Sequence, residues 1–145
     1  MDRWEQAAAV LRELRGLGFR VRVEGERLLV TPVPGAQLTD EQRTEIVAVK
    51  PELLATLRNE AFRAAMLAAV DDIAAAWVPD TEPSLVLVAV EAELDKAADQ
   101  VEHSLGPALD ALERWRTLWL ERCRAERSFR ERGQAHERGR IGAAR

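Results

Sequence analysis

The segment 19–31 constrains the fold of this chain more than any other. Apolar residues alternate with arginines over 19–23, a second β-prone run covers 27–31, and Glu24-Gly25 stand between the two. This period of two predicts two strands joined as a hairpin, each with one apolar face. Because an isolated two-stranded hairpin is marginally stable in water, helices must cover its apolar face.

The side chains of this hairpin divide into two expected faces. With Glu24 and Gly25 as a two-residue loop, the register places Val21 opposite Leu28. The expected core face holds Phe19, Val21, Leu28 and Val30. The expected outer face holds Arg20, Arg22, Arg27 and Leu29. Open strand edges accept extended peptides, and the outer arginines would select acidic ones. Alternatively, the arginines only solvate the outer face and protect the edge.

Helices are predicted on both sides of the hairpin. Spacing of three and four residues indicates a first helix over 4–17, with Asp2 as its N-cap. The residues 39–42 have the pattern of a capping box at the start of a second helix. Pro51 suits the first turn of a third helix, whose apolar stripe continues to about residue 77.

Two further helices are expected in the second half of the chain. Heptad-like spacing predicts a helix over 84–104, although the run 85–90 alone also fits a buried strand. Gly106-Pro107 begins the last helix, whose apolar pattern fades beyond Arg127. The fold class is therefore mainly α (α+β), with an αββαα module followed by an antiparallel helical bundle.

These elements predict three regions along the chain. They are a docking-like module over 3–58, a helical bundle over 59–130, and a basic disordered tail over 131–145. The net charge of −4 is uneven: residues 61–113 hold 2 basic against 11 acidic residues, and residues 114–145 hold 10 against 4. A basic C-terminal end suggests either attraction to the acidic middle or an anionic partner.

That basic end is the basis of an alternative function in nucleic-acid binding. The candidate contacts are Arg122, Arg124, Arg127, Arg130 and Arg132. Guanidinium groups can neutralise phosphates, but interleaved glutamates such as Glu126 instead suggest surface ion pairs. In this alternative the chain is an accessory protein of a mobile element or of replication.

The sequence contains no constellation of catalytic or metal-binding residues. His103 and His136 are the only histidines, and with the single Cys123 they lack metal-ligand spacing. Cys123 lies on the inner stripe of the last helix and is expected in the core. No phosphate-binding loop or dinucleotide fingerprint is present. We therefore expect neither an enzyme nor a cofactor. With no secretory signal and no membrane span in view, we expect a cytoplasmic protein.

The segment 11–57 resembles the N-terminal docking domains of the TubC type, which begin subunits of nonribosomal-peptide and polyketide synthetases. The shared features are, in order, a Leu-rich first helix, Gly18, the hairpin Arg20-Val21-x-Val23-Glu24-Gly25-x-Arg27-Leu28-x-Val30, Pro34-Gly35, Leu38-Thr39, and Lys50-x-Glu52-Leu53-Leu54. The match covers about a third of the chain. Free-standing relatives also resemble parts of bacterial mobile-element proteins.

The resemblance implies a fold and a partner. The fold is αββαα and forms homodimers, and the exposed hairpin receives a terminal or extended segment of another protein. The hairpin positions that carry over are Arg20, Arg22, Arg27 and Leu29. Leu29 departs from the family pattern, which is polar or basic there, so this docking face is less charged.

Overall fold

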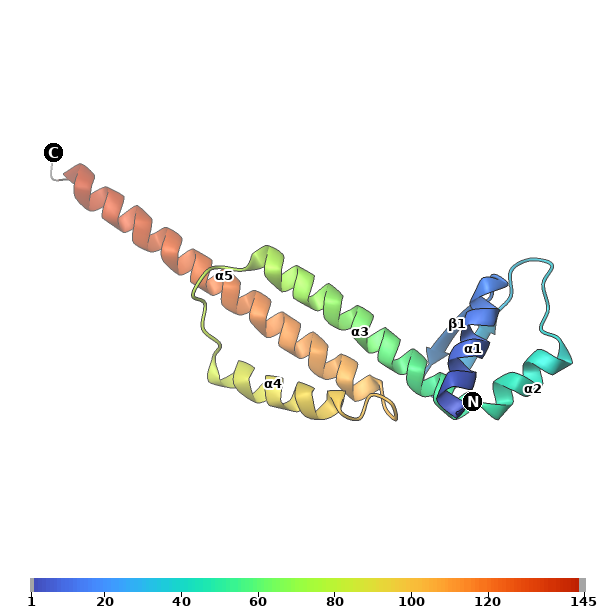
Figure 1. Cartoon of the computed structure of the whole chain (residues 1–145). Coiled ribbons are helices and arrows are strands. Elements are labelled where there is room, and N and C mark those ends of the chain that lie inside the picture. The colour runs from blue at the N-terminus through green and yellow to red at the C-terminus, as the bar shows by residue number, and fades with distance from the viewer. Residues whose placement is uncertain (1, 144–145) are drawn as a thin grey trace. The chain divides into compact units, whose positions relative to one another are not determined.

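A computed structural model describes residues 2–143 of the chain, and the side chains of residues 2–140. Its elements run in the order α1 (Arg3–Gly16), β1 (Arg20–Glu24), β2 (Arg27–Thr31), α2 (Asp40–Ala48), α3 (Lys50–Ala76), α4 (Leu85–Ala98) and α5 (Gly106–Ala143). Figure 1 follows them by colour. The structure is mainly helical with one small antiparallel hairpin, as predicted.

The chain divides into two compact units whose boundaries differ from the predicted ones. The first unit is Met1–Arg63 together with Asp99–Ala108, and the second is Ala64–Ala98 together with Leu109–Arg145. The division at residue 63 lies inside α3, where the sequence offers no turn or linker to mark it. The segment 99–108 belongs with residues far from it in the sequence, so periodicity could not assign it.

The hairpin of the first unit has a different loop from the predicted one. Gly25 and Glu26 form the turn, and Val21 pairs with Val30 rather than with Leu28. Gly25 has φ +61° at the first loop position, and Glu26 avoids positive φ at the second. That is the pattern of a type II′ turn, in which glycine alone takes the left-handed conformation. The predicted register required Glu24 in that conformation and is wrong.

The register error leaves the two faces of the hairpin unchanged. A shift of two residues keeps every side chain on its side of the sheet, because strand side chains alternate with period two. The apolar face packs against α1, α2 and the start of α3. The buried cluster consists of Ala7, Leu11, Leu14, Phe19, Val21, Ile46, Val49, Leu53 and Leu57. Val23, Leu28 and Val30 pack against this cluster from the hairpin.

The predicted helix starts are confirmed by their hydrogen bonds. In α1 the Glu5 amide donates to Asp2 Oδ1 at 2.7 Å, and the Asp2 amide donates back to the Glu5 carboxylate. In α2 the Gln42 amide donates to Thr39 Oγ1 at 3.1 Å, with the reciprocal bond at 2.9 Å. Each reciprocal pair satisfies amide groups that a helix start leaves without partners. Pro51 lies in the first turn of α3, as expected.

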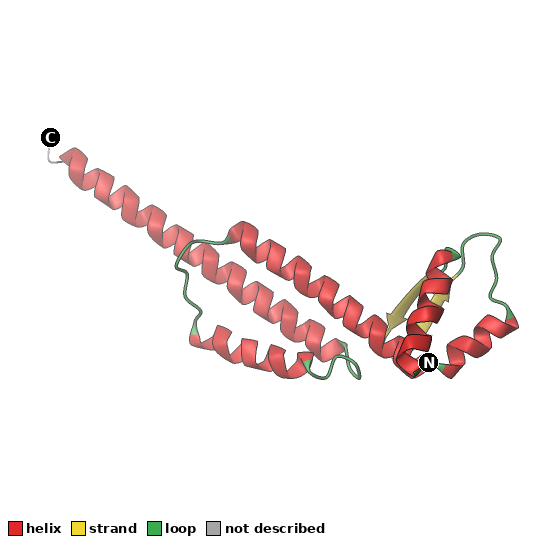
Figure 2. Cartoon of the chain, viewed as in Figure 1, coloured by secondary structure: helices red, strands yellow, loops and turns green. Residues whose placement is uncertain are grey.

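The second unit is a three-helix arrangement (Figure 2). The helix α4 runs antiparallel to the second half of α3 and to α5, which run in the same direction (Figure 1). Ion pairs join α5 to both neighbours: Arg116 to Asp72 at 2.8 Å and Arg114 to Glu93 at 3.0 Å. The run 85–90 is helical, as predicted. The helix α4 ends at Ala98, however, and not at the predicted residue 104.

The predicted disorder of the tail is wrong for residues 131–143, which continue α5 as a helix. This stretch contains no proline, and most of its residues are straight-chain or small residues that a helix accepts. The fading apolar pattern correctly indicated that 132–140 are exposed. Without an apolar stripe, this part of α5 does not pack against other elements, but it remains helical.

We predict opposite effects for alanine at two exposed glycines. Gly25→Ala places a β-carbon at φ +61° with open space around it, so we expect a loss of about 1–2 kcal/mol of stability from backbone strain. Gly16→Ala, at a helical position with equally open space, should stabilise the protein by up to about 1 kcal/mol. Chemical denaturation of both variants checks the pair. Equal destabilisation would contradict the turn assignment.

Candidate docking site

The outer face of the hairpin presents three arginines to solvent. Arg20 pairs across the strands with Thr31, and Arg22 pairs with Leu29. Arg20, Arg22 and Arg27 are exposed, and Leu29 is partly buried between strand neighbours. The structure thus brings all four predicted partner-binding residues onto one face. They form a small apolar centre with cationic flanks.

These arginines are not used by the fold. Among the residues that the structure describes, none of the three makes an ion pair or a side-chain hydrogen bond. Two other arginines of the same unit are engaged: Arg3 pairs with Glu52 at 2.8 Å, and Arg15 pairs with Glu60 at 2.7 Å. Arg12 and Arg43, on α1 and α2, make no such contact among the described residues. The hairpin guanidinium groups are therefore available to an outside carboxylate.

Both edges of the hairpin are open within the described part of the chain. The sheet has two strands, and no hydrogen bond joins residues 20–31 to any other element there. Glu24 and Arg27 flank the two-residue loop and are the first hydrogen-bonded pair of the hairpin. Along an antiparallel pair of strands, hydrogen-bonded residue pairs alternate with pairs whose backbone groups point away from the partner strand. Val21 and Val23 therefore point their N–H and C=O groups toward the open edge of β1. Their partners on β2 do the same at the opposite edge.

A groove borders the open edge of β1. It has a volume of about 280 Å³ and lies between residues 21–23 and the α3 residues Leu57, Glu60 and Ala61. Arg15 and Glu60 form its charged wall through their bidentate hydrogen bonds of 3.2 and 2.7 Å. The hydrogen bonds that Arg15 donates to the Glu60 carboxylate raise the pKa of Arg15 above its ordinary value, so this wall stays charged.

Most arginines of the alternative nucleic-acid site already form hydrogen bonds or ion pairs within the protein. Arg122 donates to the Glu82 carbonyl at 2.8 Å and Arg127 to the Ala76 carbonyl at 3.4 Å. Arg130 binds the Pro79 carbonyl and pairs with Glu126. Arg124 and Arg132 are exposed and make no ion pair or side-chain hydrogen bond among the described residues. Only two of the five candidate cations are therefore free for phosphate.

The remaining reactive residues do not form a site together. Cys123 is 1% exposed, which confirms its place in the core. His103 and His136 are both exposed and lie in different units. No cluster of three or more histidine, cysteine or acidic residues in the described chain has the arrangement of a metal site. Trp77 packs against Trp119 in a tilted arrangement, with ring centroids 5.4 Å apart and the planes inclined by 53°.

Sequence reasoning missed a second concave region of the first unit. It is a cavity of about 360 Å³ whose polar lining includes Arg58, Glu52 and His103. The one sequence feature that could have indicated this cavity is Arg58, a charged residue one turn after Leu54 on the apolar side of α3. The other lining residues come from distant parts of the chain, and no periodicity brings them together.

Comparison of the chain with protein-family models, with curated proteins and with solved structures found no match. Within the described residues, no helix has both the length and the apolar character that a membrane crossing requires. The functional interpretation therefore depends on the geometry of the hairpin and on the residues that it exposes.

Proposed function

We propose that this protein is a non-enzymatic docking adaptor that binds an extended, acidic segment of another protein at its hairpin. The observation that carries the proposal is the combination of two open strand edges with three arginines that have no partner in the described chain. An incoming strand would satisfy the outward amide and carbonyl groups of one edge. Its acidic side chains would then meet the outer arginines.

The two kinds of contact have different roles in this proposal. An exposed ion pair contributes only about 0.2–1 kcal/mol, so the arginines provide selectivity more than strength. A protein hydrogen bond contributes about 0.5–1.5 kcal/mol net, and strand addition forms several of them. The partly buried Leu29 adds an apolar contact at the centre of the face. The resulting affinity should be modest and should weaken with salt.

A selection from displayed random peptides tests the docking proposal. We expect acidic, extended sequences to be enriched, and Arg22→Glu combined with Arg27→Glu to weaken their binding by at least about tenfold, because attraction becomes repulsion. The circular dichroism of the variant should be unchanged, since both side chains are exposed. Fluorescence anisotropy with a labelled selected peptide measures the effect.

A matched control separates the hairpin from overall charge. Arg12→Glu combined with Arg43→Glu makes the same charge change at exposed arginines of α1 and α2, and should leave binding intact. Hydrogen exchange identifies the edge: strand addition at β1 should protect the Val21 and Val23 amides. Undiminished binding by the hairpin variant, or binding without protection at either edge, contradicts the proposal. Homodimer formation remains an expectation from the family resemblance.

A further inference from the structure

An apolar stripe runs along the exposed side of α4 in the second unit. It consists of Leu85, Val88, Ala89 and Ala92, whose spacings of three and four residues make them neighbours on one side of the helix. All four are exposed, and Leu85 is 90% and Val88 50% exposed. Single exposed apolar residues are ordinary, but a contiguous group of them marks a surface for interaction.

The contacts that α4 makes within the protein leave this stripe uncovered. Leu87, on the core side of the helix, is fully buried. Glu93 pairs with Arg114 of α5 at 3.0 Å, so that side of α4 is turned toward α5. Val88 is five positions from Glu93, which corresponds to about 140° around the helix. The stripe therefore faces neither the core nor α5.

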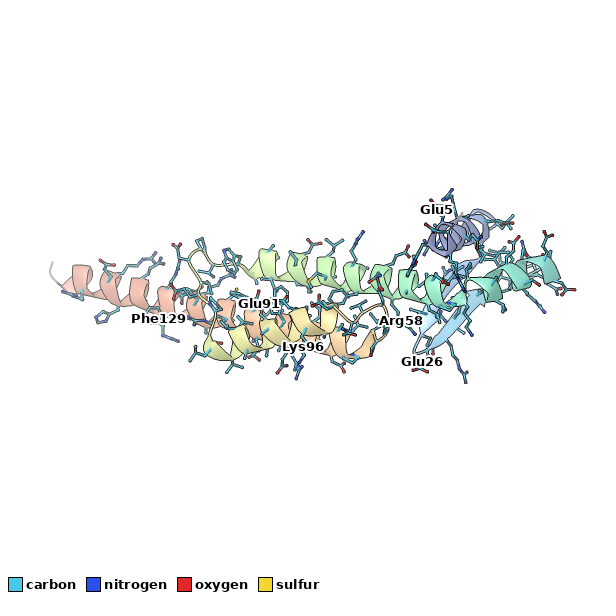
Figure 3. The ribbon with its side chains drawn as sticks, turned by 60° about the horizontal axis from the view of Figure 1, so that its bottom comes forward. Glu5, Glu26, Arg58, Glu91, Lys96 and Phe129 are labelled. Carbon is cyan, nitrogen blue, oxygen red and sulfur yellow. The ribbon has the colours of Figure 1, made fainter. Side chains whose placement is uncertain are left out.

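Acidic residues border the stripe. Glu91 lies three positions after Val88, and Asp95 lies three positions after Ala92, so each is a neighbour of the stripe on the helix surface. Both are exposed, and neither makes an ion pair among the described residues. Lys96 is the only lysine or arginine within residues 64–113. Figure 3 shows Glu91 and Lys96 on α4. The border is therefore negative on balance.

The second unit already holds acidic helices together with a basic one. Arg114 and Arg116 of α5 bind Glu93 of α4 and Asp72 of α3 at 3.0 and 2.8 Å. The stripe offers the same chemistry on the outer side of α4, where the bordering carboxylates have no cation. A second copy of α4 would bring another negative border against the first, and like charges repel. The charges therefore favour a basic partner over pairing of this stripe with itself.

From this complementarity we propose that the α4 stripe binds a basic amphipathic helix of another protein. The apolar side of that helix packs on Leu85, Val88 and Ala92, and its lysines or arginines meet Glu91 and Asp95. A helix fits because the stripe presents side chains at helical spacing and offers no open strand edge. The stripe shares no residue with the hairpin face and has the opposite charge, so the chain has one site for an acidic partner and another for a basic one.

A designed peptide tests this inference with the full-length protein. The probe is a synthetic helix of about 18 residues, or about five turns, with leucines at spacings of three and four and lysines elsewhere. We expect saturable binding by fluorescence anisotropy, with methyl NMR shifts at Leu85 and Val88. Val47, an exposed valine of α2 in the first unit, should not shift. A scrambled peptide of the same composition should bind at least about tenfold more weakly, because its leucines no longer share one side.

Two protein variants separate the apolar contact from the charges. Leu85→Gln combined with Val88→Gln should weaken peptide binding at least about tenfold without a change of charge, because the buried apolar contact is lost. Glu91→Gln combined with Asp95→Asn should weaken binding and make it less sensitive to salt. Circular dichroism of both variants should be unchanged, since all four side chains are exposed.

The matched control is Leu17→Gln combined with Val47→Gln, which makes the same apolar-to-polar change at exposed positions of the first unit and should leave binding intact. Equal binding of the Leu85→Gln and Val88→Gln variant overturns the inference. So does equal binding of a peptide with glutamates in place of its lysines. A dimer of the free protein that this variant abolishes, measured by analytical ultracentrifugation, also overturns it, because a second copy then covers the stripe.

Discussion

Replacing Leu53 with alanine should remove about 2–5 kcal/mol of stability, a large share of what a small domain possesses. Leu53 is completely buried in the cluster where α3 meets α1 and the hairpin. Truncation leaves a cavity among rigid helix and strand side chains that cannot close around it. Guanidinium unfolding, followed by circular dichroism, and hydrogen exchange of the Leu57 amide inside α3 measure the loss.

Leu17→Ala is the control for this substitution. Leu17 is the C-cap residue of α1 and is 52% exposed, so the same chemical change should cost far less there. Similar losses in the two variants would mean that the cluster does not stabilise the first unit. The Arg22→Glu and Arg27→Glu variant provides a further comparison, because it should lose binding without losing stability.

Leu87→Ala should destabilise the second unit by a comparable amount, about 2–5 kcal/mol. Leu87 is fully buried in α4, and its amide donates to Ser84 Oγ at 3.2 Å at the helix start. Leu85 lies two positions earlier in the same helix and is 90% exposed. Leu85→Ala should therefore change stability by less than about 0.5 kcal/mol. Thermal unfolding of both variants, with Trp fluorescence as the signal, checks the difference.

The parts of the fold that were predicted correctly have short-range causes. The N-cap at Asp2 and the capping box at Thr39 need only residues within three positions, and the hairpin faces need only alternation. For this reason the outer arginines were placed on the correct face even though the register was wrong. Periodicity also identified α4 as a helix over a run that had the composition of a strand.

The failures have equally specific causes. The register depended on which loop position Gly25 occupies, and the alternation pattern is the same for both choices. The end of α5 was placed too early because an apolar stripe reports packing, whereas helix formation continued without it. The cavity around Arg58 unites residues separated by up to 99 positions, from Trp4 to His103, and only tertiary structure reveals it.

The hydrogen bonds between α5 and the segment 76–82 join arginine side chains of α5 to main-chain carbonyls of the segment. Arg122, Arg127 and Arg130 all donate to carbonyl oxygens, which every amino acid carries. These three hydrogen bonds therefore place no demand on the side chains at 76, 79 and 82, which can change during evolution while the bonds persist. The three arginines have no such freedom, and related chains should retain them even where positions 76, 79 and 82 have diverged.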